Sequence, residues 1–157
     1  MFISIFKDSL IQVTPSFKLN EFFSKCPDFA KTSHLLDFRL ITAVQAIRDY
    51  YGMPVFITSS YRTPFCNAKS GGAYNSFHLT GRAIDFSCPN INSKIKEDIL
   101  AKGKLYTSLR SIGINGFGFS NSFIHFDVRT TGSLHDPAFA LGYEIWYYDP
   151  NPGLSRN

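Results

Sequence analysis

Two histidines and one aspartate have the residue types and the spacing that could hold a catalytic metal. His78 and Asp85 lie seven residues apart at the end of a stretch rich in Gly, Asn and Ser, and His125 lies in the later segment FIHFDVR. Two imidazoles and a carboxylate, with a fourth position left to water, form a ligand set typical of catalytic zinc. Zinc lowers the pKa of such a water to about 7, so that it can attack an amide carbonyl. These residues therefore indicate a zinc-dependent hydrolase.

Strand alternation predicts that two of these side chains meet. Along residues 83–87, Asp85 points to the opposite side from its two apolar neighbours, and His125 does the same within residues 122–129, because successive side chains of a strand alternate in direction. If the two strands share a sheet, Asp85 and His125 lie over the same face. His78, at the end of the preceding loop, would then close the site.

Helices are predicted in two parts of the chain. Over residues 35–51, apolar residues recur at three- and four-residue intervals and form one stripe. Ser33 is the expected N-cap, and Gly52 is expected to stop the helix. Residues 93–112 are predicted to form one or two shorter helices that break near Gly103.

Strands and loops account for most of the remainder. Residues 59–82 contain many Gly, Asn, Ser and Pro and are predicted to be a long loop region that carries chemistry. The opening fifteen residues are expected to form a strand or a loosely docked arm. The tail from Gly142 contains an aromatic cluster, Tyr143 and Trp146–Tyr148, and its end, rich in Pro, Gly and Asn, is expected to be frayed. Because helices and strands segregate rather than alternate, the predicted class is α+β. The predicted strands are residues 54–58, 83–87, 114–119 and 122–129, with the last two as a hairpin.

The composition fits one globular domain and excludes several other classes. Of the 157 residues, 44% are apolar and 18% are charged, which is an ordinary globular composition. The net charge of +4 favours approach to anionic polymers, but the basic residues are scattered, and no nucleic-acid partner is expected. No segment approaches transmembrane length. The N-terminus lacks a signal-peptide pattern, so we expect synthesis in the cytoplasm.

The cysteines and one further histidine are predicted to have no chemical role. Cys26, Cys66 and Cys88 are odd in number and include no C-x-x-C pair, so neither a disulfide framework nor a cysteine zinc site is expected. They are predicted to be small buried or partly buried thiols in a reducing compartment. His34, just before the predicted long helix, is expected at the surface or beside its cap.

Three blocks of the sequence resemble the M15 peptidase family, which comprises zinc-dependent D-Ala-D-Ala carboxypeptidases and peptidoglycan endopeptidases, phage endolysins among them. The family patterns S-x-Y-R, S-x-H-x-x-G-x-A-x-D and H-x-D occur in order within SSYRTPFCNAKSGGAYNSFHLTGRAIDF and GFGFSNSFIHFDVR. Together with the lead-in RDYYGMPVFITS, the resemblance covers about residues 17–131. It implies a fold like that of Hedgehog and the D-Ala-D-Ala peptidases, in which helices flank a small, mostly antiparallel sheet.

The resemblance also assigns roles to single residues. Arg62 would bind the substrate carboxylate or the carbonyl oxyanion, a role that suits its planar and permanently charged fork. Ser76 would orient the substrate or a metal ligand by hydrogen bonding. The zinc ligands would be His78, Asp85 and His125.

The resemblance leaves the general base open. Many family members place an acid three residues before the last histidine ligand, where this chain has Ser122. Asp127 follows that ligand by two residues, as in the branch with the H-x-D ending. It could act as the base, or it could orient His125 and pair with Arg129. His135, in a later loop, is a further candidate for moving a proton.

Two functions are carried forward from the sequence. The leading hypothesis is a zinc peptidase that hydrolyses an amide bond in bacterial peptidoglycan peptides, as a carboxypeptidase or an endopeptidase. Such an enzyme would be phage- or prophage-encoded and would reach the wall by lysis or virion entry. The alternative is a non-catalytic metal-binding or wall-binding module that retains the zinc site, which the missing acid at Ser122 supports. The sequence leaves the oligomeric state open, with a monomer as the expectation.

Overall fold

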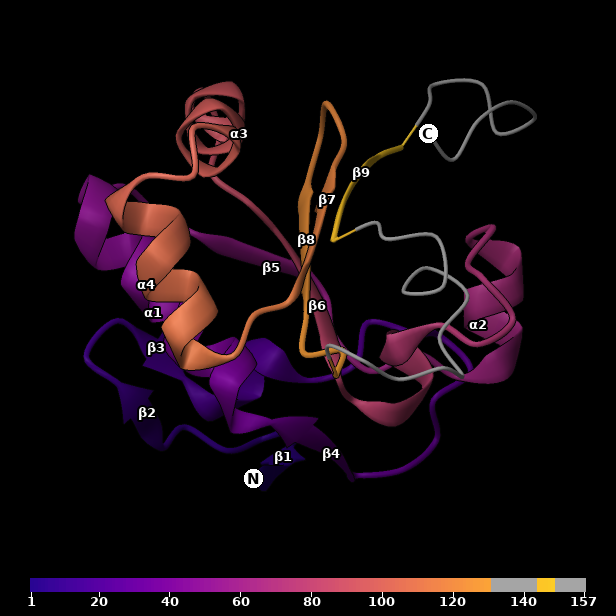
Figure 1. Cartoon of the computed structure of the whole chain (residues 1–157). Coiled ribbons are helices and arrows are strands. Elements are labelled where there is room, and N and C mark those ends of the chain that lie inside the picture. Colours follow the sequence, from indigo (N-terminus) through magenta and orange to yellow (C-terminus); the bar gives the residue numbers. More distant parts are fainter. Residues whose placement is uncertain (131–143, 149–157) are drawn as a thin grey trace.

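A five-stranded sheet runs through the middle of the molecule, as Figure 1 shows. The computed structural model describes residues 1–130 and 144–148. The strand order is β5-β6-β8-β7-β9, and all neighbours are antiparallel except the parallel pair β7 and β9. The predicted α+β class with a mostly antiparallel sheet is therefore confirmed. The strands are β5 (Phe56–Ser59), β6 (Ala83–Ser87), β7 (Gly116–Phe119), β8 (Ile124–Asp127) and β9 (Ile145–Tyr147).

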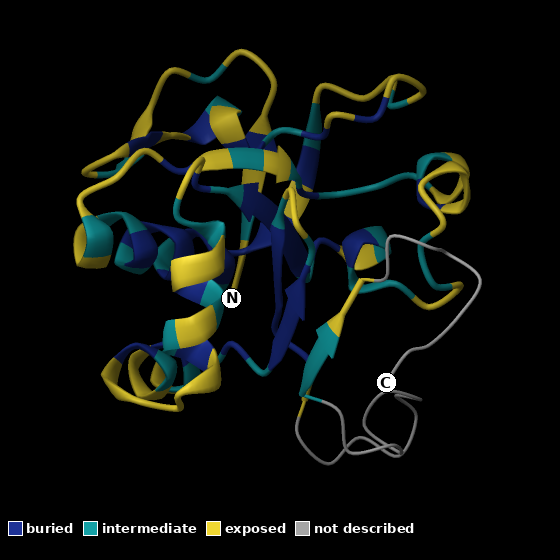
Figure 2. Ribbon diagram, turned by 90° about the horizontal axis from the view of Figure 1, so that it is seen from above, coloured by how far each residue is buried: buried dark blue, intermediate teal, exposed yellow. Residues whose placement is uncertain are grey.

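Helices cover the two faces of this sheet unequally. In Figures 1 and 2, α1, α3 and α4 lie on one side of the sheet, and the short α2 lies on the other. Two 3-10 turns, η1 and η2, complete the helical elements of the described residues. The bounds are η1 (Leu19–Phe22), α1 (Phe38–Tyr51), α2 (Pro64–Lys69), η2 (Phe77–Thr80), α3 (Asn92–Leu100) and α4 (Lys104–Ile112).

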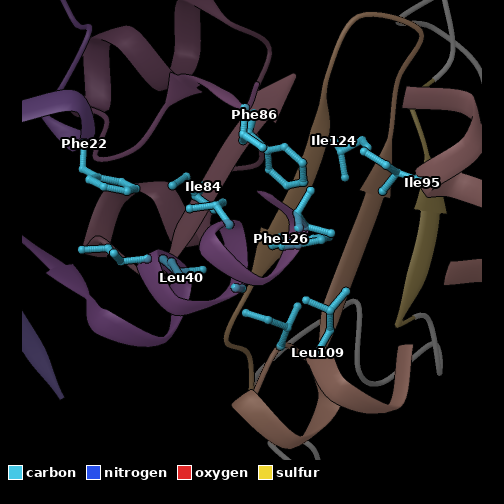
Figure 3. Close-up of a cluster of buried hydrophobic side chains, with 14 of the residues drawn as sticks. Phe22, Leu40, Ile84, Phe86, Ile95, Leu109, Ile124 and Phe126 are labelled. Carbon is cyan, nitrogen blue, oxygen red and sulfur yellow. The ribbon is translucent and has the colours of Figure 1, made fainter. Parts of the chain in front are cut away.

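The hydrophobic core fills the space between the sheet and its three-helix side. Figure 3 shows Phe86 of β6 and Phe126 of β8 packed together there, with ring centroids 4.9 Å apart. Leu40 of α1 and Leu109 of α4 are fully buried in the same cluster. Burying a large apolar side chain contributes about 1.5–3 kcal/mol, so these contacts fix which face of the sheet points inward. The opposite face is left to the polar side chains that alternate with them.

The N-terminal part of the chain forms two small ladders of its own. β1 pairs antiparallel with β4, and β2 pairs antiparallel with β3. The first fifteen residues thus contain strands, one of the two alternatives that the sequence allowed. The bounds are β1 (Phe2–Phe6), β2 (Gln12–Thr14), β3 (Phe17–Lys18) and β4 (Ser33–Asp37).

The predicted start of the long helix is wrong. Residues 35–37 belong to β4, and α1 begins only at Phe38. Asp37, not Ser33, is the N-cap, and its side chain accepts a hydrogen bond from the backbone N–H of Arg39. The backbone of β4 is paired with β1, and this tertiary pairing overrides the helical spacing of the apolar residues. The predicted end is confirmed, since Gly52 takes the left-handed conformation with φ of 64°.

The other predicted elements agree with the structure except in one segment. The four predicted strands lie within two residues of β5, β6, β7 and β8 at each end. The two helices over residues 93–112 break at Gly103, as expected. Residues 59–82, predicted as loop, contain α2 and η2. The Thr63 hydroxyl, which accepts from the Cys66 N–H, caps α2, and a proline follows at its first position.

The prediction of free thiols is wrong for two of the three cysteines. Cys26 and Cys66 form a disulfide with their Cα atoms 5.8 Å apart, which is an ordinary separation for such a bridge. The two residues are 40 positions apart in the chain, so only the folding of α2 onto the segment after η1 brings them together. Cys88 is free and buried, as expected.

The C-terminal part contributes a strand that was not predicted. Residues 145–147 form β9 and pair with β7. His135, the start of the tail at Gly142 and the Pro/Gly/Asn-rich end that was expected to be frayed lie outside the described residues. No helix within residues 1–130 and 144–148 is long and apolar enough to cross a membrane.

Candidate metal centre

His78, Asp85 and His125 converge on one point of the sheet face that lies opposite the core. Nε2 of His78 lies 3.2 Å from Oδ1 of Asp85 and 3.2 Å from Nδ1 of His125. The same Nδ1 lies 2.7 Å from Oδ1 of Asp85. All three residues are buried. Three donor atoms from residues up to 47 positions apart thus form a compact triangle.

The sheet register places two of these residues side by side. Asp85 of β6 is the direct antiparallel partner of His125 of β8, so both side chains leave the same face, as the alternation predicted. Directly opposed residues have side chains about 4.5–5.5 Å apart at Cβ, which brings two ligand atoms within reach of one ion. The pairing of the apolar neighbours against the core holds this register in place.

A capped 3-10 turn brings in the third residue. His78 lies on η2, and the Ser76 hydroxyl accepts a hydrogen bond from its backbone N–H at 3.3 Å. Gly81 ends the turn with φ of 67°, and a Cβ there would lie 2.2 Å from the carbonyl oxygen of Leu35. Glycine is therefore required at position 81. Ser76, predicted to orient the substrate or a ligand, contacts the backbone of a candidate ligand.

Hydrogen bonds on the far side of each ring set which nitrogen faces the other ligand atoms. Nδ1 of His78 donates to the backbone carbonyl of Ser60 at 2.6 Å. Nε2 of His125 donates to Oδ2 of Asp127 at 3.2 Å. These partners assign the tautomers of the neutral rings. In those tautomers, Nε2 of His78 and Nδ1 of His125 offer their lone pairs beside Asp85. Such outer hydrogen bonds are typical of metal-binding histidines.

The carboxylate of Asp127 is fully committed to neighbouring groups. Arg129 donates to it through Nε at 2.8 Å and Nη2 at 2.6 Å, and its backbone N–H donates at 3.1 Å. Asp127 is completely buried. At Gly116, on the neighbouring strand, a Cβ would come within 2.4 Å of the carboxylate oxygens, so glycine makes room for this ion pair. The arrangement matches the role of orienting His125, one of the two roles left open by the sequence.

Arg62 reaches the metal centre from the loop after β5. Its Nη2 donates to Oδ2 of Asp85, and its Nε donates to the Ser59 hydroxyl at 2.8 Å. The backbone N–H of Arg62 donates to the carbonyl of His78 at 3.0 Å. The guanidinium thus lies against the outer oxygen of a candidate ligand, where a permanent positive charge keeps that carboxylate ionised.

Burial and the neighbouring charges shift the pKa values of all three residues in the metal-free centre. Burial lowers the pKa of His78 by more than Asp85 raises it. Burial alone would raise the pKa of Asp85, but the two histidines lower it far below its usual range. Burial would likewise lower the pKa of His125, but hydrogen bonds with Asp127 and Asp85 raise it to about 9. His125 therefore carries a second proton, on the nitrogen beside Asp85, in the metal-free protein, and a metal would displace this proton on binding.

The loop beneath the centre is tied to the N-terminal part of the chain. The Ser60 hydroxyl donates to the carbonyl of Phe22 at 2.7 Å, and the Ser24 hydroxyl donates to the carbonyl of Tyr61 at 2.8 Å. The Cys26–Cys66 disulfide closes the same junction. We call the paired segments 22–28 and 59–66 the bracket. It holds the carbonyl that orients His78 and the loop that carries Arg62.

His34 belongs to this junction and not to the surface. It is buried on β4, and its Nε2 accepts from the backbone N–H of Ser24 at 3.0 Å. Its ring stacks on Tyr61 with centroids 5.4 Å apart. Burial lowers the pKa of His34, so it stays neutral and acts as part of an aromatic cluster. The expected surface position is wrong because β4 replaces the first turn of the predicted helix.

Two members of the aromatic cluster noted in the sequence form a wall beside the metal centre, a position that was not predicted. Trp146 of β9 lies 5.2 Å from the His125 ring between centroids, and the Arg129 guanidinium lies 4.6 Å from the centroid of the Trp146 ring. Tyr148 lies 6.3 Å from the His125 ring. Gly118 makes room for this wall, since a Cβ there would lie 2.8 Å from both aromatic rings.

The donor set fits a small tetrahedral cation. Ligand atoms bound at 2.0–2.1 Å to zinc would lie about 3.3 Å from one another, close to the separations of 3.2, 3.2 and 2.7 Å found here. Two neutral imidazole nitrogens and a carboxylate oxygen are also the donors that zinc accepts in hydrolases. The site is thus a candidate metal centre of the hydrolase type, carried on an α+β fold.

Comparison with known proteins gives this class a family. The model of the peptidase M15 family matches residues 15–127, which is well over half of the chain. The protein belongs to the peptidase M15 family, and the resemblance seen in the sequence is confirmed. Membership implies a metallopeptidase that acts on a peptide substrate. A search of curated proteins gave no match.

Proposed function

We propose that this protein is a zinc-dependent peptidase that hydrolyses an amide bond in the peptides of bacterial peptidoglycan. The observation that carries the proposal is the buried triangle of His78, Asp85 and His125 in a member of a peptidase family. Both imidazoles are oriented by partners outside the triangle, so the chain itself prepares the donor atoms for a cation. Carboxypeptidase and endopeptidase action are both compatible with this centre.

The three residues of the triangle would hold the metal, and their neighbours would hold the substrate. Bound there, zinc would supply a Lewis acid that polarises a carbonyl and makes water nucleophilic near neutral pH. Arg62 offers a fixed positive charge at the rim, suited to a substrate carboxylate or to a carbonyl oxygen that gains charge. Asp127 holds His125 in one tautomer. Ser76 caps the turn that presents His78.

A second candidate function is a metal-binding module without peptidase activity. Ser122, at the position where many relatives carry an acid, is exposed in the turn between β7 and β8. The nearby carboxylate of Asp127 is occupied by Arg129 and His125. Neither residue is a ready proton acceptor for water, and this favours a site that binds metal but does not hydrolyse.

Digestion of purified peptidoglycan separates the two candidates. Metal analysis should find close to one zinc per chain, and mass spectrometry of the digest should show a new peptide end. His78→Ala, Asp85→Ala and His125→Ala should each remove most of the metal and all of the cleavage. Asp49→Ala, on the far helix α1, serves as the matched control. One zinc per chain without any new peptide end would favour the metal-binding module over the peptidase. Full metal content in all three variants would show that these residues do not bind the metal.

We propose that the enzyme acts at the cell wall, outside the reducing cytoplasm. The Cys26–Cys66 disulfide supports this place of action, because disulfides persist mainly in oxidising compartments. A phage- or prophage-encoded enzyme released at lysis would reach such an oxidising environment. Alkylation of free thiols in protein recovered from the wall fraction tests the place of action, with one reactive thiol per denatured chain expected and three arguing against it.

A further inference from the structure

Tyr148 is held at the edge of the metal centre by the sheet itself. Its backbone N–H donates to the carbonyl of Phe119 at 2.9 Å, which extends the pairing of β9 with β7. Its ring lies 5.0 Å from the ring of Phe123 and 6.3 Å from that of His125. Gly118 leaves the room that this ring occupies. The position of Tyr148 is therefore set by backbone and packing, as a residue that takes part in chemistry requires.

The hydroxyl of Tyr148 lies within the electrostatic reach of the centre. The pKa of Tyr148 is raised, first by shielding of its hydroxyl from water and next by the carboxylate of Asp85, while the indole N–H of Trp146 and the charge of Arg62 lower it. The residue as a whole is 41% exposed, so the shielding concerns its hydroxyl end. A tyrosine hydroxyl has an ordinary pKa of about 10, so it carries its proton at neutral pH and can donate a hydrogen bond.

A substrate can approach Tyr148 from solvent. The residue borders a hollow of about 320 Å³ between the first turn of α3 and the end of β7. Tyr148 contacts the His125 ring on one side and this open space on the other. It thus stands between the candidate ligands and a place where a peptide could lie.

The other polar groups around the centre have partners or other roles. Asp127 accepts from Arg129 and His125. Arg62 donates through Nε to Ser59 and through Nη2 to Asp85, and its charge at the rim suits the substrate carboxylate. The backbone N–H of Ser122, in the exposed turn, donates to the Ser120 hydroxyl. Stabilisation of the reacting carbonyl calls for a donor aimed at the oxygen that gains charge, and among the described residues Tyr148 is well placed to supply it.

We propose that Tyr148 is a catalytic residue whose hydroxyl donates a hydrogen bond to the carbonyl oxygen of the scissile amide. This inference rests on the function proposed above. As water adds to the carbonyl carbon, the electron pair of the C=O bond moves onto the oxygen, and the hydrogen bond strengthens. When the C–N bond breaks, that pair returns and the amine leaves with a proton from the attacking water. Tyr148 keeps its own proton throughout, so the step needs no other reactant.

Tyr148→Phe tests the proposal because it removes one oxygen atom and keeps the ring. On the soluble peptide identified from the wall digest, kcat should fall about 100-fold, as for the loss of one oxyanion donor, while KM changes less than threefold. A phosphinate analogue of that peptide resembles the tetrahedral species, and calorimetry should show it binding about 100-fold more weakly. Zinc content should stay at one per chain. Tyr50→Phe, which removes a hydroxyl from the exposed side of α1, is the matched control and should change none of these values.

The possible outcomes distinguish the role of Tyr148 from the peptidase activity on which that role depends. An active wild-type protein with a Tyr148→Phe variant within threefold of its kcat overturns the role of Tyr148 and leaves the peptidase intact. A variant that loses affinity for the uncleaved peptide and the phosphinate equally shows a binding contact only, and it also overturns the role. A wild-type protein that neither cleaves the peptide nor binds the phosphinate overturns both proposals.

Discussion

The contacts of Asp127 favour a role in orienting His125 over a role as the general base. A base must be free to accept a proton from water, but the oxygens of Asp127 accept three hydrogen bonds from Arg129 and one from His125. Burial alone would raise the pKa of Asp127, yet these partners, Arg129 foremost, lower it well below its usual range. A carboxylate with so low a pKa is a poor proton acceptor. Its position favours the role of fixing the His125 ring.

The two roles of Asp127 predict different results for Asp127→Asn. If Asp127 fixes His125, the variant should bind zinc about 10- to 100-fold more weakly, and excess zinc should restore part of the turnover. If Asp127 is the base, zinc affinity should stay within threefold, while turnover falls about 100-fold or more at every zinc concentration. Competition with a chromogenic chelator measures the affinity, and we expect the first result. Asp98→Asn, which changes a carboxylate on α3 that pairs with Tyr51 and Lys94, should leave both quantities unchanged.

The two histidines predict an unusual pH dependence for the metal-free protein. The pKa of His78 is lowered in the folded state, so the stability that it contributes is present above its unfolded value of about 6.5 and is lost as the pH falls below it. The pKa of His125 is raised to about 9. Its contribution is full below about 6.5 and is lost as the pH rises toward 9. The free energy of unfolding should therefore peak near pH 6.5.

Urea unfolding in the presence of a chelator, from pH 5 to pH 9, checks this dependence. The decline above pH 6.5 should be on the order of 1–3 kcal/mol, given 1.36 kcal/mol for each unit of pKa difference. His125→Gln should abolish that decline and keep the one below pH 6.5. Stability that is flat from pH 6.5 to 9 in the wild-type protein would contradict the pairing of His125 with two carboxylates.

At the scale of elements, alternation along strands was the most informative signal in the sequence. It placed Asp85 and His125 on one face of the sheet, and their direct pairing in the register explains why the inference succeeds. The same local reasoning failed for residues 35–37, because their pairing with β1 is a contact with the far end of the chain. It also failed for α2, whose cap and proline stand within a segment full of loop-forming residues.

The aromatic wall illustrates what local patterns do not contain. β9 joins the sheet as a parallel neighbour of β7, although it follows β8 in the sequence and no local periodicity links it to β7. Trp146 and Tyr148 could thus be seen as an aromatic group but not assigned to the metal centre. Pairing between distant segments is decided by the whole fold, and the same holds for the Cys26–Cys66 bridge.

A substitution at Gly118 tests how the side chains of β9 and Tyr148 pack against β7. In Gly118→Ala, the new Cβ would lie 2.8 Å from atoms of Trp146 and Tyr148, so the two rings must move. We expect a loss of about 1–3 kcal/mol of stability, as for overpacking in a well-filled site, and a shift in tryptophan emission. The protein has one tryptophan, so this emission reports on Trp146 alone.

Gly103→Ala is the matched control for this change. A Cβ at Gly103 meets nothing within 4 Å, so only the weaker N-cap preference of alanine remains, and stability should change by less than about 1 kcal/mol. The emission of Trp146 should stay as in the wild-type protein. Equal effects from both substitutions would mean that the rings do not rest against β7.

At the scale of the whole molecule, the bracket joins the N-terminal ladders to the loop that serves the metal centre. The hydroxyls of Ser24 and Ser60 and the disulfide all act across the same junction. Thr63 adds a further hydrogen bond to Asp28 at 2.6 Å, on the exposed side. The positions of Arg62 and of the carbonyl that orients His78 therefore depend on contacts made by the first thirty residues of the chain. The M15 match begins at residue 15 and so includes the half of the bracket that precedes β4.

Opening the disulfide should destabilise the protein by a predictable amount. The bridge closes a loop of 40 residues, for which the loss of chain entropy in the unfolded state is worth about 4 kcal/mol. The variant with Cys26→Ser and Cys66→Ser should unfold at a correspondingly lower urea concentration. Because Ser24, Ser60 and Thr63 still tie the bracket together, the folded variant should keep its zinc.

Reduction of the wild-type protein separates the bridge from the effect of the substitutions. A reducing agent should lower the stability of the wild-type protein to that of the double serine variant and should leave the variant itself unchanged. Cys88 is buried and free and is present in both the wild-type protein and the variant. It therefore cannot cause a difference in their stability on reduction. If reduction leaves wild-type stability unchanged while the protein binds zinc, the bracket is held by hydrogen bonds and packing alone. The place of action outside the cytoplasm would then lose its structural support.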